Sequence, residues 1–489
     1  MDKNWKIELS HIPKVLESAR INIRAWRRDK NLTNEIPQDI ELDLLSVYVA
    51  EYIPIEHVDK LNKGLKKLVN KHRMQYEFGQ IDRIDDFCIN VKQSIHGGRW
   101  SNFGYIKFEE EKISQFVEKV NINGTHLSSS SIILQFIITP SKDFCSEFKK
   151  IVEGNIRENL TFNLTLKNLF KYWGGGRLAA SITKNQLLED YIVELKWRTM
   201  KEVSKYFDLF FTTTKLIPPS IEVYKLNQSA CALKHKNDGK VNNFWRSVGM
   251  DSYFSDISKD GYWNLFMDDR STHFIDNSLK VTCNSKIKKE PMFHSLDFQI
   301  VYLLQEFAES LLPIMVMREY ANYTSKKVAI HQNKILSSLT KQNPKYKSLI
   351  NIRYELEKNL QILKRFKNEI DENYFDRVKA EVKKITAFEP SKPKDLSATE
   401  LIVDNTSYIV EKTNNHSQFF AKMIDDTVQL LEIKTNNSLR KSSFWLSVIT
   451  VVLSIAATVF AGLSLFYQLS EENQNKVIRS LILILNLFR

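Results

Sequence analysis

Two short segments combine glycines with an arginine and a tryptophan, the residue types that can hold a phosphorylated ligand. One is His96-Gly97-Gly98-Arg99-Trp100 and the other is Trp173-Gly174-Gly175-Gly176-Arg177. Glycine lets the backbone approach a phosphate closely, arginine can pair with it, and tryptophan can stack on a base. The two segments are therefore a candidate site for a nucleotide-like activating ligand. Turns that carry buried tryptophans would have the same composition, and neither segment matches a named phosphate-binding motif.

The sequence contains no recognisable catalytic or metal-binding motif. Its ten histidines are dispersed, and none lies in an H-E-x-x-H spacing. It has neither a G-x-S-x-G nucleophile motif nor a G-x-x-x-x-G-K-[ST] phosphate loop. We therefore expect no enzymatic activity, no catalytic residues, no metal and no cofactor other than the activating ligand.

The bulk composition is that of a folded protein in a reducing compartment. Four cysteines are far apart in a chain of 489 residues, which predicts free and mostly buried thiols. The net charge of +12 fits either an anionic ligand or a surface near anionic lipid. The basic residues are scattered and form no nucleic-acid motif, so we expect no direct nucleic-acid partner.

A long apolar segment lies near the end of the sequence, where no charged residue occurs between Ser442 and Ser470. A helix needs about 20 apolar residues to cross a hydrocarbon core of ~30 Å, which predicts a transmembrane helix at Phe444–Leu469. The N-terminal residues have no apolar secretion signal. We therefore expect the inner (cytoplasmic) membrane, with the N-terminal head in the cytoplasm and the lipid bilayer as a partner.

Small and polar residues within this segment follow one another at alternating steps of three and four. That spacing keeps them on one stripe of a helix in a left-handed bundle. The stripe consists of Ser447, Thr450, Ser454, Ala457, Ala461, Ser464 and Gln468. It predicts either a packing seam between helices or a pore wall whose hydroxyls replace part of an ion's hydration. Both interpretations require self-association as a homo-oligomer, because the sequence has one full span.

Helical patterns precede the apolar segment. A capping box at Ser397-Ala-Thr-Glu400 begins a stretch that we predict to be one continuous helix as far as Leu469. A narrow apolar stripe from Leu349 to Ile385 predicts a helix that packs antiparallel on it. The region from Phe293 to Val316 is apolar but contains charges, so we predict a buried helix there.

The N-terminal half alternates between strand and helix patterns, which predicts a mixed α+β head. Strands are expected at 40–53, 102–109, 130–139, 221–226 and 278–283, and helices at 143–153 and 185–211. The predicted layout is a ligand-sensing head at 1–290, a helical region at 291–396, a stalk helix at 397–443, a transmembrane helix at 444–469 and a short apolar segment at 470–489.

This order of parts resembles the CorA superfamily of divalent-cation channels. In that family a stalk helix continues into the first span, which ends in an Ala-Gly pair before a Gly-Met-Asn motif. Thr458-Val-Phe-Ala461-Gly462 is similar to that ending. The next residues, Leu463-Ser464-Leu465-Phe466, lack Gly-Met-Asn, and the second apolar stretch at Val477–Phe488 is short.

The resemblance implies a function that lies outside magnesium transport. CorA-like proteins without the transport motif accompany bacterial antiviral systems such as type III CRISPR. We therefore expect a homo-oligomeric membrane effector, a pore or channel gated by a small nucleotide signal. The alternatives are a membrane-anchored interaction module without a pore, and a divergent divalent-cation transporter.

Overall fold

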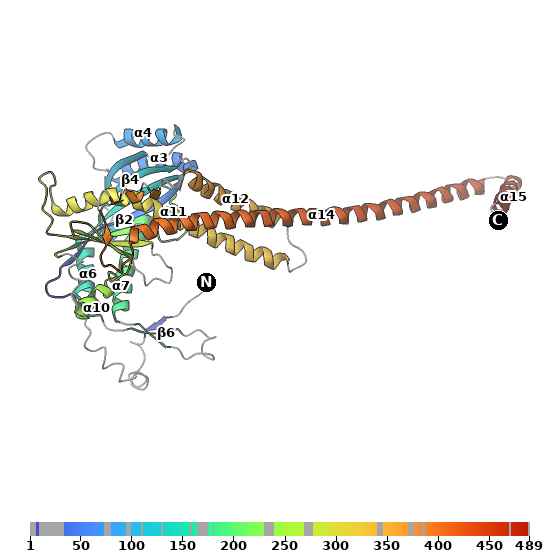
Figure 1. The fold of residues 1–489 in the computed structure, drawn as a ribbon. Coiled ribbons are helices and arrows are strands. Elements are labelled where there is room, and N and C mark those ends of the chain that lie inside the picture. Colours follow the sequence, from blue (N-terminus) through green and yellow to red (C-terminus); the bar gives the residue numbers. More distant parts are fainter. Residues whose placement is uncertain are drawn as a thin grey trace. The chain divides into compact units, whose positions relative to one another are not determined.

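The computed structural model describes most of the chain in two units (Figure 1). The described residues are 6–8, 34–72, 80–93, 99–108, 111–128, 131–156, 159–163, 175–178, 180–228, 239–267, 277–339, 346–369, 375–376, 378–380, 382–383, 387–468 and 471–487. Contacts divide the chain into a first unit, Met1–Ala329 with Lys358–Ser417, and a second unit, Ile330–Glu357 with Gln418–Arg489.

A nine-stranded sheet forms the centre of the first unit, in the order β12-β9-β10-β11-β8-β2-β5-β4-β3. Its strands are β2 (Leu42–Pro54), β3 (Arg99–Ile106), β4 (Val117–Ser128), β5 (Ser131–Pro140), β8 (Ser220–Leu226), β9 (Ser255–Ile257), β10 (Trp263–Met267), β11 (Ser278–Asn284) and β12 (Glu389–Pro390). Neighbouring strands are antiparallel except β8 and β11, which are parallel. A separate antiparallel sheet joins β1 (Lys6–Glu8), β6 (Asn159–Asn163) and β7 (Gly175–Leu178).

Both faces of the large sheet are apolar, so each face carries its own core. Strand β5 illustrates this, because Leu134 and Phe136 belong to one core whereas Ile133 and Ile137 belong to the other. Side chains alternate between the two faces of a strand, so a continuous run of β-branched and aromatic residues is buried on both sides.

Helices cover each face. The first core is covered by α3 (Val58–His72), α4 (Gln80–Gln93), α6 (Lys142–Glu153), α7 (Ala180–Val203) and α10 (Gly239–Ser247). In Figure 1, α3 and α4 lie beside β4, and α6, α7 and α10 lie together. The second core is covered by α8 (Phe210–Thr213), α11 (Leu296–Leu339), α12 (Tyr346–Glu369) and the beginning of α14 (Ala398–Gln468). The mixed α+β class is therefore confirmed.

Helix α11 confirms the buried helix that was predicted from Phe293 to Val316. Phe307, Leu311 and Met315 have no exposed surface and lie in the second core. The helix continues past Val316 and past Pro313, to a total of 44 residues.

Helix α14 begins at the predicted cap and continues without interruption for 71 residues (Figure 1). The backbone N–H of Glu400 donates to Ser397 Oγ at 3.2 Å, which is half of the expected capping box. Asp256 of β9 accepts hydrogen bonds from the N–H and the hydroxyl of Thr399, both at 2.9 Å. A buried carboxylate at a helix N-terminus compensates its unpaired N–H groups and its dipole, so the edge of the sheet holds the beginning of α14.

Ion pairs show that α12 and the helical residues after it run antiparallel to α14. In the first unit, Lys367 pairs with Glu411 at 3.6 Å and Lys379 pairs with Asp404 at 2.6 Å. In the second unit, Arg353 pairs with Asp425 at 2.9 Å. Residue numbers rise on one helix as they fall on the other, which confirms the predicted antiparallel packing.

Candidate membrane segment and ligand site

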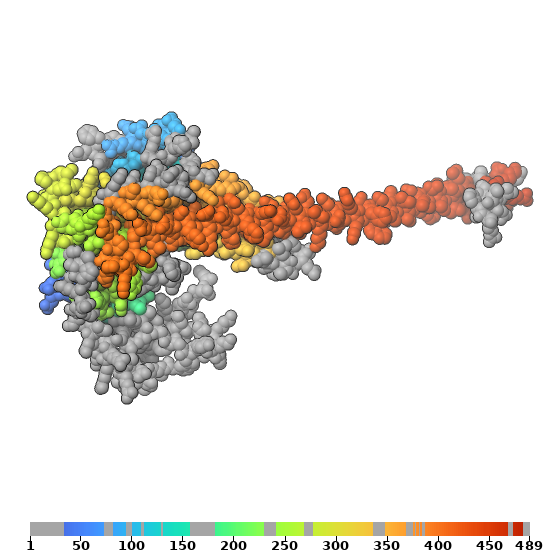
Figure 2. Space-filling view, in the orientation of Figure 1, coloured from blue at the N-terminus to red at the C-terminus, as the bar shows by residue number. Residues whose placement is uncertain are grey.

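The apolar part of α14 is exposed along its length in the second unit. Trp445 is 63% exposed, Leu453 63%, Phe460 72% and Tyr467 78%. In Figure 2 this part of the helix is coloured red, and its surface is visible in this view. Soluble monomers rarely expose apolar surfaces this large, whereas a lipid environment would cover one.

Among the residues that the structure describes, two helices are long and apolar enough to cross a membrane, and burial distinguishes them. The apolar window of α11 is 61% buried, whereas that of α14 is 0% buried. The apolar residues of α11 are therefore largely buried in the core of the first unit. The apolar residues of α14 are exposed.

The polar stripe lies on α14, and its hydroxyl groups bond within the helix. Ser447 Oγ donates to the carbonyl of Ser443 at 3.0 Å, and Thr450 Oγ1 donates to that of Leu446 at 2.8 Å. Each hydroxyl oxygen keeps lone pairs that can accept a hydrogen bond or coordinate a cation. The hydroxyls of Ser447 and Thr450 therefore need no further acceptor for their donors and still present lone pairs.

A further helix, α15 (Glu471–Leu487), follows the apolar segment and includes the predicted short apolar stretch. Gln474 Nε2 donates to the carbonyl of Phe466 at 3.1 Å and so joins the beginning of α15 to the last turns of α14. Its 17 residues reach about 26 Å, less than the hydrocarbon thickness of ~30 Å.

The two glycine-rich segments do not belong to the same sheet. Gly97, Gly98, Trp173 and Gly174 lie outside the described residues. Arg99 and Trp100 begin β3 of the large sheet, whereas Gly175, Gly176 and Arg177 lie in β7 of the three-stranded sheet. The two halves of the candidate ligand site therefore lie in different sheets.

Trp100 is the member of this set whose side chain the structure describes. It is 46% exposed. Its indole N–H donates to the carboxylate of Glu309 on α11. Burial raises the pKa of Glu309, and this hydrogen bond acts in the opposite direction. The tryptophan is therefore a half-exposed surface group next to a carboxylate, and the expectation of a core tryptophan does not apply to it.

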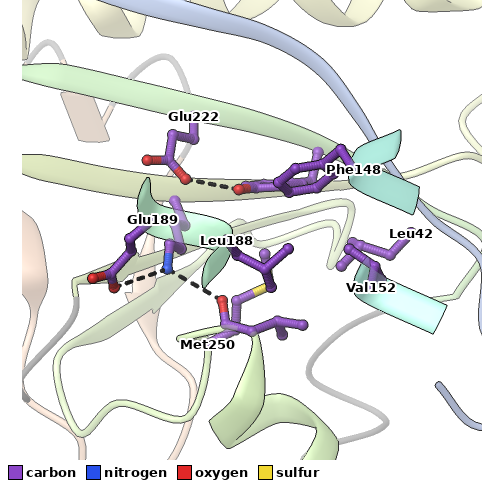
Figure 3. Close-up of a pocket in the computed structure, with 10 residues that line it drawn as sticks. Leu42, Phe148, Val152, Leu188, Glu189, Glu222 and Met250 are labelled. Atoms are coloured by element: carbon purple, nitrogen blue, oxygen red, sulfur yellow. Dashed lines mark hydrogen bonds and ion pairs between the residues drawn. The ribbon is translucent and has the colours of Figure 1, made fainter. Parts of the chain in front are cut away.

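A buried charged network on the parallel strands β8 and β11 was missed in the sequence. Tyr224 Oη and Ser278 Oγ each donate to Glu222 at 2.7 Å. The dashed line at Glu222 in Figure 3 marks the bond from Tyr224. Beside them, Lys280 Nζ donates to the carbonyl of Val248 at 3.2 Å and lies 3.8 Å from a Glu189 carboxylate oxygen. The adjoining cavity has room for about one water molecule and is therefore too small for a nucleotide.

A signal for this network was present in the sequence. Ser220, Glu222 and Tyr224 alternate with apolar residues, and so do Ser278, Lys280 and Thr282. Such alternation places all the polar groups on one face, and parallel pairing brings the two sets together.

The thiols are free, as predicted, wherever the structure describes them. Cys88, Cys145 and Cys283 form no disulfide, and burial raises the pKa of Cys88 and of Cys145 to about 11. Such thiols remain protonated at neutral pH and are poor nucleophiles. Cys231 lies outside the described residues. Across the described part of the chain, no group of three or more His, Cys, Asp or Glu side chains could hold a metal ion.

Comparison with known proteins gives no relative, because no family model, no curated protein and no solved structure matches the chain.

Proposed function

We propose that the protein is a homo-oligomeric membrane effector in which copies of α14 form a ligand-gated pore. The observation that carries the proposal is the uncovered apolar part of α14 with a polar stripe along one side. Lipid would cover its apolar faces, whereas a stripe of hydroxyls is better placed against protein or water.

Several copies are needed because one helix cannot enclose a pore. Gly462 supports close association, since an added Cβ at this position would meet no atom of the same chain within 4 Å. The fold of a single chain therefore gives no steric reason for glycine here, whereas a neighbouring helix would.

The proposed topology places the α/β unit in the cytoplasm as a ligand-sensing head, with α14 as the stalk that continues into the inner membrane. The cap formed by Asp256 supports transmission, because it ties the beginning of α14 to the edge of the sheet. A role in antiviral defence and a nucleotide signal rest on the CorA-like ending at Thr458–Gly462 and on the missing Gly-Met-Asn motif.

The test is leakage from dye-loaded liposomes that contain the full chain, with and without candidate nucleotides. Mass measurement of the same preparation gives the number of copies. Replacing Ala457 or Ala461 by leucine fills the stripe, and we expect it to abolish leakage or change the copy number. Val459→Phe adds at least as much bulk away from the stripe and should preserve leakage. If both alanine variants assemble and leak as the parent does, the stripe does not line a pore.

A passive anchor is the second candidate. The hydroxyls of Ser447 and Thr450 are already bonded within their own helix, so the stripe can also serve as a packing seam. A defined oligomer that never leaks, with any candidate nucleotide or with extract from infected bacteria, would favour this function.

A further inference from the structure

Buried polar side chains without partners gather on one face of the large sheet, where α11 covers β4 and β5. Asn123 has no exposed surface, and within the described part of the chain neither atom of its amide group has a hydrogen-bond partner. Asn121 Oδ1, Thr125 Oγ1 and Gln135 Oε1 are also buried and unpaired. Nearly all buried polar atoms in folded proteins are paired, so this cluster has hydrogen-bonding capacity that the chain itself does not use.

The strand register makes these residues one continuous patch. Asn123 lies opposite Gln135 of β5 on one side and opposite Asn102 of β3 on the other. Thr125 lies opposite Trp100. Residues directly opposite each other in a sheet point to the same face, so the patch extends from buried amides to a half-exposed indole.

Helix α11 covers the patch with a backbone acceptor and a carboxylate. Gln135 Nε2 lies 3.5 Å from the carbonyl of Ala308, which is a long hydrogen bond. Glu309 on the next position accepts from the indole N–H of Trp100. Helix α11 therefore contacts the patch at Gln135, through a long hydrogen bond, and at Trp100.

The chemistry of the patch matches a planar ligand with donors and acceptors on its edge. Asn and Gln amides form paired hydrogen bonds with the edge of adenine, and an indole stacks on the face of a base. We propose that this amide patch, formed by Asn121, Asn123, Thr125, Gln135 and Trp100, is a binding site for the adenine base of a nucleotide. The inference rests on the proposed function for its expectation of a nucleotide signal.

The position of the patch also connects binding to α14. The apolar side of α11, including Leu311 and Met315, lies in the same core as Ala398 and Ile402 in the first turns of α14. A base inserted between the sheet and α11 must move α11, which shares the second core with the beginning of α14.

The experiment is equilibrium dialysis of the full chain in mild detergent against labelled ATP, AMP and adenosine. We expect saturable binding of all three, and binding of UMP to be weaker by roughly tenfold, because uracil lacks the adenine edge. Asn123→Leu and Gln135→Leu should each weaken adenosine binding roughly tenfold or more. Trp100→Ala tests the stacking surface at a half-exposed position, where folding is least at risk.

Thr282→Val is the matched control, because it removes another buried and unpaired hydroxyl on the opposite face of the sheet. It should leave adenosine binding unchanged. If no adenine compound binds at millimolar concentration, or if Asn123→Leu binds as the parent does, the amides hold buried water only and the inference fails. If adenosine binds but no leakage occurs, the proposed pore is refuted and the proposed binding site stands. If another ligand triggers leakage in the Asn123→Leu variant, the binding site is refuted and the pore stands.

Discussion

Replacing Glu51 by glutamine should remove a large part of the protein's pH dependence of stability. Glu51 is fully buried on β2 and accepts hydrogen bonds from the N–H groups of Phe211 and Thr212 at 2.8 and 2.9 Å. The Thr212 hydroxyl donates to it as well, at 2.5 Å. These donors favour the carboxylate, but burial is the larger effect and raises the pKa of Glu51 from 4.5 to about 7.

The direction in which stability changes with pH follows from proton binding to Glu51. The folded protein holds the Glu51 proton more tightly than the unfolded chain does, so stability from this group is fully present below pH 4.5. It decreases as the pH rises to about 7 and is constant above that. The difference between 4.5 and about 7 corresponds to about 3 kcal/mol of unfolding free energy.

The assay is unfolding of the full chain in mild detergent, followed by circular dichroism between pH 4.5 and 8. The stability difference between the parent and Glu51→Gln should change by about 3 kcal/mol in favour of the variant as the pH rises. A Glu51→Gln difference that is constant across this range would refute the reasoning.

Three further substitutions test contacts that position the main elements. Asp256→Ala leaves the N–H and hydroxyl of Thr399 without an acceptor and should lower the unfolding free energy by about 3 kcal/mol, measured by thermal unfolding. Lys184 donates to three buried backbone carbonyls, so Lys184→Met should cost about 3 kcal/mol in denaturant unfolding, and a loss below about 1 kcal/mol would contradict this. Arg353→Glu should cost about 1 kcal/mol because its pairs with Asp425 and Glu357 are partly exposed, and adding Asp425→Arg should restore part of the stability, since the pair with Glu357 stays broken.

Local patterns predicted much of the fold. Strands β5 and β8 were recognised because β-branched residues, which are enriched in strands, follow one another in both segments. The beginning of α14 was recognised because a capping box is encoded within four residues. Strand β4 was missed because Asn121, Asn123 and Gly124 are poor strand formers, and only pairing with β3 and β5 places them in the sheet.

The candidate sites divide in the same way. The stripe on α14 could be predicted from the sequence because the helical period determines which residues lie on the same face. The network of Glu222 and Lys280 depends on a parallel register between strands that are far apart in sequence. The two glycine-rich segments contain residue types that can bind a phosphorylated ligand. Their strands belong to separate sheets, however, and composition alone does not reveal this.

The internal hydrogen bonds of the α14 hydroxyls bear on how the protein would be made. Ser447, Thr450 and Thr458 donate to carbonyls of their own helix, so these three hydroxyls would enter a bilayer with their donors already paired even in a lone copy. Insertion would then precede association, and the two steps would respond to different conditions. Newly synthesised copies would wait in the membrane as separate chains, and the onset of assembly would depend on their surface density, which ties the response of a cell to its expression level.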